Sequence, residues 1–241
     1  MNRIEVIGHR GASAHAPENT LAAFRRAVEL GARFVETDLR VTRDGRFVLL
    51  HDAKVNRTTN GRGRVANFSL AELRRLDAGA WFSPSYARER VPTLEEALDL
   101  AESLGFRIYL ELKARLKSGQ MIELARMLRE RRALARVVLL SFSARALARM
   151  RAVEPSLRTT LLVGRRGPAI GPARRVGATV LAPWHERINR RMMRRARKAG
   201  LGVVAWTVND PGDIRRMIEL GVDGIMSDWP ERVAQALRER W

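Results

Sequence analysis

Residues 202 to 227 read GVVAWTVNDPGDIRRMIELGVDGIMS and contain one complete strand, helix and strand unit. A β-rich run begins at Gly202, and a second one begins at Asp223. The segment between them is helix-like and stops at Gly221, a residue type that ends many helices. Units of this length are typical of parallel strands joined by right-handed crossovers.

Similar units occur along the whole chain. In the second half, further β-rich runs begin at Val137, Thr159 and Thr179, so that successive runs start 20 to 23 residues apart. The first half adds three units, whose strands are IEVIGHRG (4–11), RFVETDLR (33–40) and RIYLELK (107–113). Eight βα units in 241 residues predict an α/β fold, the (β/α)8 TIM barrel. An open doubly wound sheet is the alternative, but the chain has neither a GxGxxG nor a phosphate-loop pattern.

Three of the expected helices have features of note. One covers residues 20–30, with Asn19 as its N-cap, and another covers residues 118–131. The third, NRRMMRRARKAG (189–200), places its basic side chains on a broad arc and its methionines and alanines on the other side. We expect this arc to be the solvated face of an outer helix, although a helix that binds phosphate backbones or a membrane surface would share the pattern.

One stretch of the first half interrupts the alternation of strands and helices. VTRDGRFVLLHD (41–52) is too short to contain a crossover helix. Asp44-Gly45 lies between two apolar runs and favours a hairpin, so FVLL is expected to return antiparallel to the strand before it. Residues from about 52 to 92 then form a small insertion after the second strand, which we expect to cap one mouth of a single barrel domain over residues 1–241.

Composition and charge limit the possible functions. The chain has no cysteine, which excludes disulfides, cysteine nucleophiles and cysteine-based zinc sites. No stretch has the apolar length of a signal peptide or a membrane span, so we expect a cytoplasmic protein without stable membrane insertion. The net charge of +19 attracts anions. Because the basic residues occur in nearly every predicted helix and not in one stripe, we expect no nucleic-acid partner.

Charged and ionisable side chains gather at the C-terminal ends of the predicted strands, where barrel active sites are built. They are His9, Arg10, Glu36, Asp38, His51, Glu111 and Lys113. Glu36 and Asp38 lie two apart on one strand and share a face, where like charges repel. A hard divalent cation, Mg²⁺ or Ca²⁺, would neutralise them together with Glu111, so these three carboxylates are candidate metal ligands. The alternative is that Glu36 and Asp38 pair with Arg33 and Arg40 on the surface.

The histidines divide into two groups. His9 and His51 end a strand and a hairpin return, and two imidazoles are suited to paired general acid and base catalysis. His15 and His185 are interpreted as structural, although APWHER around His185 also ends a strand and could line the mouth.

Six motifs in order resemble those of glycerophosphodiester phosphodiesterases, over nearly the whole chain from His9 to about Pro230. The motifs are HRGASAHAPENTLAAF (9–24), ETD (36–38), LLHD (49–52), VPTLEEAL (91–98), LELK (110–113) and AWTVND (205–210). The resemblance implies a barrel enzyme that uses one divalent cation to hydrolyse a small-molecule glycerophosphodiester to glycerol 3-phosphate and an alcohol.

The resemblance also implies a role for each matching residue. Glu36, Asp38 and Glu111 become the metal ligands, and His9 and His51 the catalytic pair. Arg10 and Lys113 would contact the phosphate, and Trp206 would shape the glycerol pocket. By analogy with related phospholipases, His9 is assigned as the base and His51 as the acid.

Two motifs contain residues that we interpret as structural. In PENT, Pro17, Asn19 and Thr20 are typical of a helix start, and Glu18 is left outside the expected site. Asn209 in TVND is interpreted as a turn or cap residue.

Two competing functions remain from the sequence. A lipid-directed relative on the same barrel would need exposed apolar residues near the mouth, and Trp81, Phe82 and Tyr86 in the insertion could serve, although such aromatics usually anchor a small cap by packing. A basic barrel that binds nucleic acid or anionic membrane has only the net charge in its favour.

Overall fold

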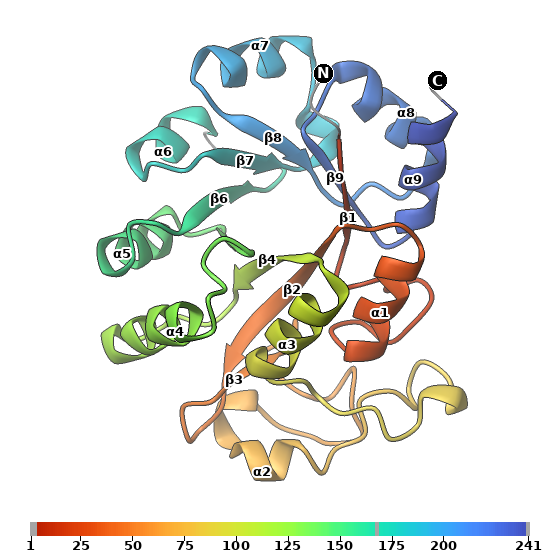
Figure 1. The fold of residues 1–241 in the computed structure, drawn as a ribbon, viewed down its shortest axis with the longest axis vertical. Coiled ribbons are helices and arrows are strands. Elements are labelled where there is room, and N and C mark those ends of the chain that lie inside the picture. The colour runs from red at the N-terminus through yellow and green to blue at the C-terminus, as the bar shows by residue number, and fades with distance from the viewer. Residues whose placement is uncertain (1–3, 167–168, 240–241) are drawn as a thin grey trace.

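The computed structural model describes residues 4–166 and 169–239. Within these residues, eight parallel strands close into a barrel, because β1 pairs with β2 on one side and with β9 on the other (Figure 1). Around the barrel the order is β1, β2, β4, β5, β6, β7, β8 and β9. The barrel strands are β1 Glu5–Gly8, β2 Phe34–Val41, β4 Arg107–Leu112, β5 Val137–Ser141, β6 Arg158–Val163, β7 Val180–Pro183, β8 Gly202–Ala205 and β9 Gly224–Ser227. The predicted TIM barrel is confirmed.

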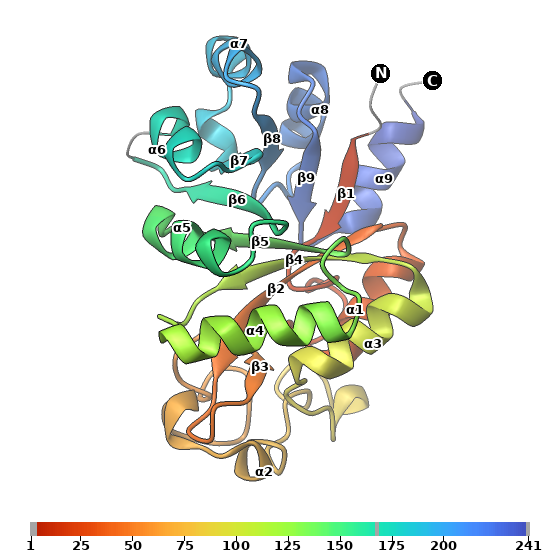
Figure 2. The ribbon, with the colours of Figure 1, turned by 60° about the vertical axis from the view of Figure 1, so that its left-hand side comes forward.

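Helices surround the barrel on its outer side (Figures 1 and 2). They are α1 Leu21–Glu29, α3 Leu94–Leu104, α4 Ser118–Glu130, α5 Ala144–Val153, α6 Ile170–Arg175, α7 Arg190–Lys198, α8 Pro211–Leu220 and α9 Pro230–Arg238. Local sequence signals set several of their ends. Asp210 caps the start of α8, and Gly221 ends this helix in the left-handed conformation with φ of 71°. In α7, Met193 and Ala196 are buried and the arginines point outward, as expected of an outer helix.

The core has two layers because strand side chains alternate between the two faces of the sheet. Phe34, Tyr109 and Met226 belong to a cluster to which all eight barrel strands contribute, and this cluster fills the barrel interior. Val35 and Leu110, which directly follow Phe34 and Tyr109 in the sequence, point to the outer face of the sheet and pack against the helices. Side chains that follow Phe34 and Tyr109 at intervals of two residues therefore point into the mouth of the barrel.

The expected N-cap of α1 was wrong by one residue. Thr20, and not Asn19, caps this helix, since its Oγ1 accepts a hydrogen bond of 3.2 Å from the backbone N–H of Ala23. Asn19 lies just before the cap in the left-handed conformation with φ of 58°. Its side chain is thereby directed away from the helix, toward β2.

The hairpin and the insertion follow β2. β3 (Phe47–Leu49) pairs antiparallel with β2, with Leu39 opposite Leu49, so the predicted hairpin is confirmed. The insertion then contains the short helices η1 (Val65–Asn67), α2 (Leu70–Leu73) and η2 (Pro84–Tyr86), at the bottom of Figure 1. A cluster separate from the two barrel layers supports it, and consists of Val48, Leu50, Val55, Val65, Leu73, Ala78 and Val91.

The aromatic residues of the insertion pack on one another. The Phe82 ring lies edge-on to both Trp81 and Tyr86, with ring centroids 5.7 Å apart in each pair. The Tyr86 hydroxyl donates a hydrogen bond of 3.0 Å to the backbone oxygen of His15, in the loop after β1. This contact ties the insertion to the barrel through Tyr86, whereas Trp81 is 41% exposed. Separately, no helix in the described part of the chain combines the length and the apolarity that crossing a membrane requires.

Candidate active site

Three carboxylates meet inside the mouth of the barrel. Asp38 on β2 lies opposite Glu111 on β4 in the parallel register, and Glu36 shares the inward face of Asp38. Glu36, Asp38 and Glu111 are only 2%, 1% and 8% exposed. One oxygen from each lies within 4.8 Å of the other two, which is close enough for all three to hold one metal ion. The sequence-predicted ligand set is thus brought together, and its all-oxygen donors fit a hard divalent cation.

The crowding of these carboxylates has an electrostatic cost. Burial raises the pKa of Glu36 well above its usual range, and repulsion from Asp38 and Glu111 adds to the effect. Burial and the charge of Asp38 likewise raise the pKa of Glu111. Burial also acts to raise the pKa of Asp38, but the nearby charges of Arg10 and Lys113 prevail and lower it. A bound cation would relieve this repulsion.

Arg10 and Lys113 are the basic partners of the three carboxylates. The Lys113 ammonium lies 2.9 Å from Glu111 and 3.5 Å from Asp38. The Arg10 backbone N–H donates to Glu36 over 3.0 Å, and its Nε lies 3.4 Å from Asp38. Arg10 has a φ of 55°, in the left-handed region, which turns its backbone N–H toward the cluster. Its Nε is buried without a hydrogen-bond partner among the described residues, so this donor is available to an anion.

The alternative pairing of the acidic residues with Arg33 and Arg40 is not found among the described residues. The Arg40 guanidinium instead donates to the backbone oxygens of His51 and Lys113. These hydrogen bonds join the end of the hairpin to the end of β4, and so they help to fix His51 and Lys113 in place.

His9 is held at the mouth by Asp228, which follows β9. Nδ1 of His9 lies 2.6 Å from Oδ1 of Asp228, and its Nε2 faces Glu36 at 4.0 Å. Asp228 also accepts hydrogen bonds from Ser13 (2.8 Å) and Asn209 (2.6 Å). Burial alone would raise the pKa of Asp228, but these donors and His9 lower it to about 2. Asp228 is therefore a carboxylate at neutral pH, and it orients His9.

Asn209 was wrongly interpreted as a turn or cap residue. The cap of α8 is Asp210, one residue further on. The Asn209 side chain binds Asp228 through both of its ends, since its Oδ1 accepts from the Asp228 backbone N–H over 3.0 Å.

His51 follows β3 and has its own aspartate. Its Nδ1 lies 2.7 Å from Oδ1 of Asp52, and Arg57 of the insertion donates to the other oxygen of Asp52 over 2.8 Å. Burial lowers the pKa of His51, and the charges of Arg10 and Lys113 act in the same direction. His51 thus readily loses a proton. It lies on the same side of the mouth as Lys113, beside the carboxylate cluster.

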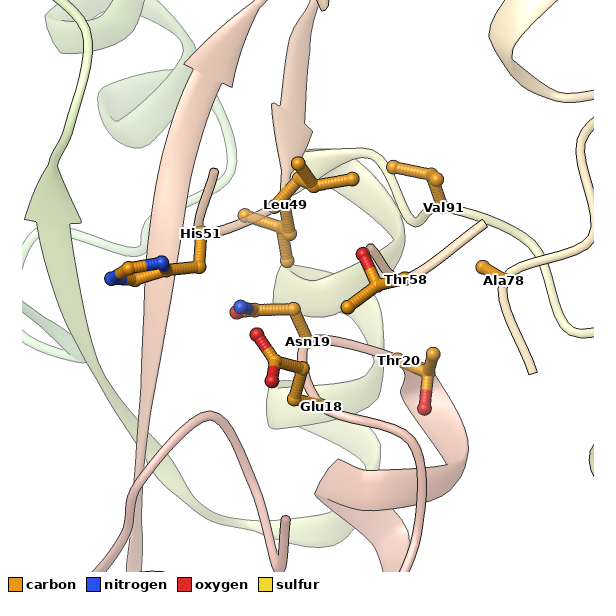
Figure 3. A pocket seen from close by; sticks show the side chains of 9 residues that line it. Glu18, Asn19, Thr20, Leu49, His51, Thr58, Ala78 and Val91 are labelled. Carbon is orange, nitrogen blue, oxygen red and sulfur yellow. The ribbon is translucent and has the colours of Figure 1, made fainter. Parts of the chain in front are cut away.

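Glu18 and Asn19 were missed by the sequence interpretation. Glu18 accepts from Arg10 over 2.9 Å and from both terminal nitrogens of Arg57 over 2.7 Å. The Asn19 amide donates to Asp38 over 2.8 Å, and its Oδ1 accepts from Thr37. Figure 3 shows both side chains directed toward the side on which His51 lies, from the loop ahead of α1. The signal was present in the PENT motif, where two polar residues precede the cap.

Aromatic rings form the other side of the mouth. Trp206 follows β8, which is separated from β4 by three strands in either direction around the barrel. The Trp206 ring lies edge-on to Phe142 and Trp184, with centroids 5.5 Å and 5.3 Å apart, and its Nε1 donates to the Ala182 backbone over 2.7 Å. Phe142 is 51% exposed, so this apolar side is accessible. Sequence reasoning selected Trp206 but not its two neighbours.

The remaining two histidines lie outside the cluster of carboxylates. His15 pairs with Glu231 over 2.9 Å. His185 is buried, and its Nδ1 lies 3.7 Å from Asp213 of α8. Neither contacts one of the candidate ligands, which agrees with their interpretation as structural.

Comparisons with known proteins place the chain in a family. Residues 9–232 match the model of the glycerophosphoryl diester phosphodiesterase family. The chain is 38% identical over 239 residues to a glycerophosphodiester phosphodiesterase of Caldanaerobacter subterraneus, covering 97% of this chain and 98% of the relative. It is 32% identical over 250 residues to a glycerophosphodiester phosphodiesterase of Bacillus subtilis, covering 95% of this chain and 85% of the relative.

Solved structures agree with the sequence comparisons. An Oleispira antarctica phosphodiesterase in complex with the product sn-glycerol-3-phosphate has a TM-score of 0.88 and 31% identity, covering 97% of this chain and 96% of that one. A glycerophosphodiester phosphodiesterase of Agrobacterium tumefaciens has a TM-score of 0.85 and 28% identity, covering 97% of this chain and the whole of that one. The chain, with its barrel and its acidic mouth, therefore belongs to the glycerophosphoryl diester phosphodiesterase family, a family of phosphodiester-cleaving enzymes.

Proposed function

We propose that this protein hydrolyses glycerophosphodiesters to glycerol 3-phosphate and an alcohol, with one divalent cation and two histidines at the barrel mouth. The observation that carries the proposal is the meeting of three buried carboxylates with two histidines, each paired through Nδ1 to its own aspartate. The names of the relatives and the product bound by the Oleispira antarctica enzyme support the choice of substrate.

Glu36, Asp38 and Glu111 would hold the cation, which fits Mg²⁺ or Ca²⁺ because all three donors are carboxylates. When bound, the cation offsets negative charge on the phosphoryl oxygens as the nucleophile approaches. Arg10 and Lys113 stabilise the same anion, since both lie beside the cluster and the Arg10 Nε has a free hydrogen to donate. The glycerol half would lie against Trp206.

His9 acts as the general base in this proposal. Because Nδ1 is paired with Asp228, Nε2 faces the cluster and can accept the proton of the nucleophile, which is water or the glycerol hydroxyl of the substrate. As the new P–O bond forms, the P–O bond to the alcohol breaks. Attack by water gives glycerol 3-phosphate directly, whereas attack by the glycerol hydroxyl gives a cyclic phosphate that water then opens in a second step. His51 in its protonated form then donates its proton to the departing oxygen, and its lowered pKa favours that transfer.

The test is release of glycerol 3-phosphate from a small panel of glycerophosphodiesters, first after exhaustive chelation and then after addition of Mg²⁺ or Ca²⁺. We expect no turnover in the first condition and turnover in the second. Full turnover after chelation would overturn the role of the cation. If no member of the panel is hydrolysed with any divalent cation, the proposed activity itself is wrong.

A further inference from the structure

A basic groove opens from the candidate active site toward the insertion. It has a volume of about 500 Å³ and is open to solvent. Its charged and ionisable lining consists of Arg40, His51, Asp52, Lys54, Arg64 and Lys113. Four of these side chains are cationic, and only one is acidic. Since His51 and Lys113 also belong to the candidate site, a ligand at the carboxylate cluster can extend directly into the groove.

Some of the charged side chains in the groove have ion-pair partners in the part of the chain that the structure describes, and others have none there. Lys113 is paired with Glu111, and Asp52 is shared by His51 and Arg57. Lys54 and Arg64 are exposed, and neither forms an ion pair within residues 4–166 and 169–239. The outer end of the groove therefore carries two positive charges without a protein counter-charge.

The backbone fixes these two residues as neighbours. An isolated antiparallel β-bridge joins Lys54 to Arg64, which places them on two adjacent segments of the insertion. Both residues line the same groove as Arg40, His51 and Lys113, so their charges face the catalytic end.

The position of the groove indicates which half of the substrate it receives. Under the proposed function, on which this inference rests, the glycerol half lies against Trp206 after β8. Lys113 follows β4, which is on the opposite side of the barrel, with three strands between β4 and β8 in either direction. A diester centred on the carboxylate cluster with its glycerol at Trp206 therefore directs its other ester oxygen toward His51 and the groove.

We propose that this groove binds the alcohol half of the diester and selects alcohols that carry a further anionic group, a phosphate or a carboxylate. Lys54 and Arg64 would form charge-assisted hydrogen bonds with that group. A quaternary ammonium alcohol such as choline is disfavoured there, because four cationic side chains line the groove and no tryptophan, tyrosine or phenylalanine is among its lining residues. The groove thus recognises an anionic group on the alcohol, in addition to the phosphodiester group that all glycerophosphodiesters contain.

The experiment compares glycerophosphoinositol with glycerophosphoinositol phosphate, which differ by one phosphate on the alcohol, and with glycerophosphocholine. We expect kcat/KM to be about tenfold higher for glycerophosphoinositol phosphate than for glycerophosphoinositol, whose alcohol is uncharged, and lowest for glycerophosphocholine. The preference should decrease as ionic strength rises, since both cations are exposed. Equal values for all three substrates would overturn the groove inference and leave the proposed hydrolysis intact.

Two double variants test whether Lys54 and Arg64 cause the preference for the phosphate-bearing diester. The double variant Lys54→Met/Arg64→Met should lose most of the preference and retain its kcat/KM on glycerophosphoinositol within about twofold. The matched control is Arg194→Met/Lys198→Met, which removes the same charges from exposed positions of α7, at the far end of the molecule from the insertion (Figures 1 and 2). This control should keep the preference. Retention of the preference in the first variant, or its equal loss in the control, would overturn the assignment to the groove.

Charge reversal supplies an independent readout that does not depend on a loss of rate. Lys54→Glu/Arg64→Glu should favour glycerophosphocholine over the phosphate-bearing diester, because the outer end of the groove then attracts a cation. An unchanged order of substrates in a variant with the melting temperature of the parent would contradict the proposal. Absence of turnover on all three substrates by the parent would contradict both this inference and the proposed function.

Discussion

Nδ1 of His9 lies 2.6 Å from Oδ1 of Asp228, although 219 residues separate the two in the sequence. The closure of the barrel produces this contact. The first strand, β1, pairs with the last, β9, and His9 and Asp228 directly follow the ends of these two strands. With Asp228 ionised, Nδ1 carries the hydrogen and Nε2 is left to accept a proton. Asp228 is thus a positioning residue for the proposed base.

Replacement of Asp228 by Asn should lower kcat by about 10²- to 10⁴-fold, because the amide no longer fixes the required tautomer of His9. KM should change little, since Asp228 contacts His9 and not the proposed phosphate site. The measurement is steady-state kinetics on glycerophosphodiesters at saturating cation. Ser13→Ala is the matched control, because it removes one hydrogen bond to Asp228 and leaves the carboxylate. An equal loss in both variants would contradict a specific role of the Asp228 charge.

The same carboxylate predicts a loss of stability in acid. Its pKa of about 2 in the folded protein lies below the ~3.9 of an exposed aspartate. A depressed folded pKa stabilises the protein above the unfolded value, and this stabilisation is lost as the pH falls through about 2. Because the side chain is partly exposed, we expect about 1–2 kcal/mol in the free energy of unfolding. Urea unfolding between pH ~5 and ~2 should show a shallower decline for Asp228→Asn than for the parent. Parallel declines would contradict the assignment.

Replacement of Glu111 by Gln should weaken cation binding without destabilising the metal-free protein. Burial and repulsion from Asp38 raise the pKa of Glu111 in the folded state, so its charge at neutral pH opposes folding. Removal of that charge should leave the melting temperature equal or higher by about 2–4 °C in a chelator. Added Mg²⁺ or Ca²⁺ should raise the melting temperature of the parent, and of the variant much less. Glu219→Gln, on the exposed surface of α8, is the control. A large loss of stability in the metal-free variant would show that Glu111 is a structural ion-pair residue.

The fold could be predicted from the sequence because its signals are local and repeated. Runs such as VVLLSF at Val137 and helix ends such as Gly221 recur at nearly constant spacing, and each is readable without knowledge of the others. The candidate ligands were also accessible, since strand periodicity places Glu36 and Asp38 on one face. The hairpin after β2 could also be predicted, because its signal, Asp44-Gly45 between two apolar runs, is local.

The supporting residues could not be predicted in this way, because their roles depend on partners far away in the sequence. Asp228 contacts His9 across 219 residues, and Glu18 contacts Arg57 across 39. Asn19 and Thr20 are both good cap residues, and the local sequence does not decide between them. The left-handed backbone of Asn19, which directs its amide to Asp38, depends on the packing of the loop against β2.

Replacement of Asn19 by Gly should therefore weaken cation binding by about tenfold, because Asp38 loses the donor that orients it. Titration of Mg²⁺ or Ca²⁺ by thermal shift measures this change. Asn19→Ala removes the same amide but should be less stable than Asn19→Gly by about 1 kcal/mol, because alanine tolerates a φ of 58° poorly. If both variants bind the cation as the parent does, the contact between Asn19 and Asp38 has no part in the site.

The two histidines can be separated by the leaving group of the substrate. If His51 protonates the departing oxygen, its loss should be severe when the alcohol is a poor leaving group, as choline and glycerol are. A p-nitrophenyl phosphodiester needs little or no protonation at that step. His51→Ala should therefore lose about 10²- to 10⁴-fold in kcat/KM on the natural diester and far less on the activated one.

His9→Ala should be impaired on both substrates, because the nucleophile must lose its proton whichever group departs. The check is kcat/KM for both variants on both diesters at one fixed cation concentration, with melting temperatures to confirm folding. Recovery of His9→Ala on the activated diester, in place of His51→Ala, would require the acid and base assignments to be exchanged. If neither variant recovers activity on the activated diester, neither histidine acts as the general acid. Lys113, whose ammonium lies 2.9 Å from Glu111, would then be the residue to test for stabilisation of the departing oxygen.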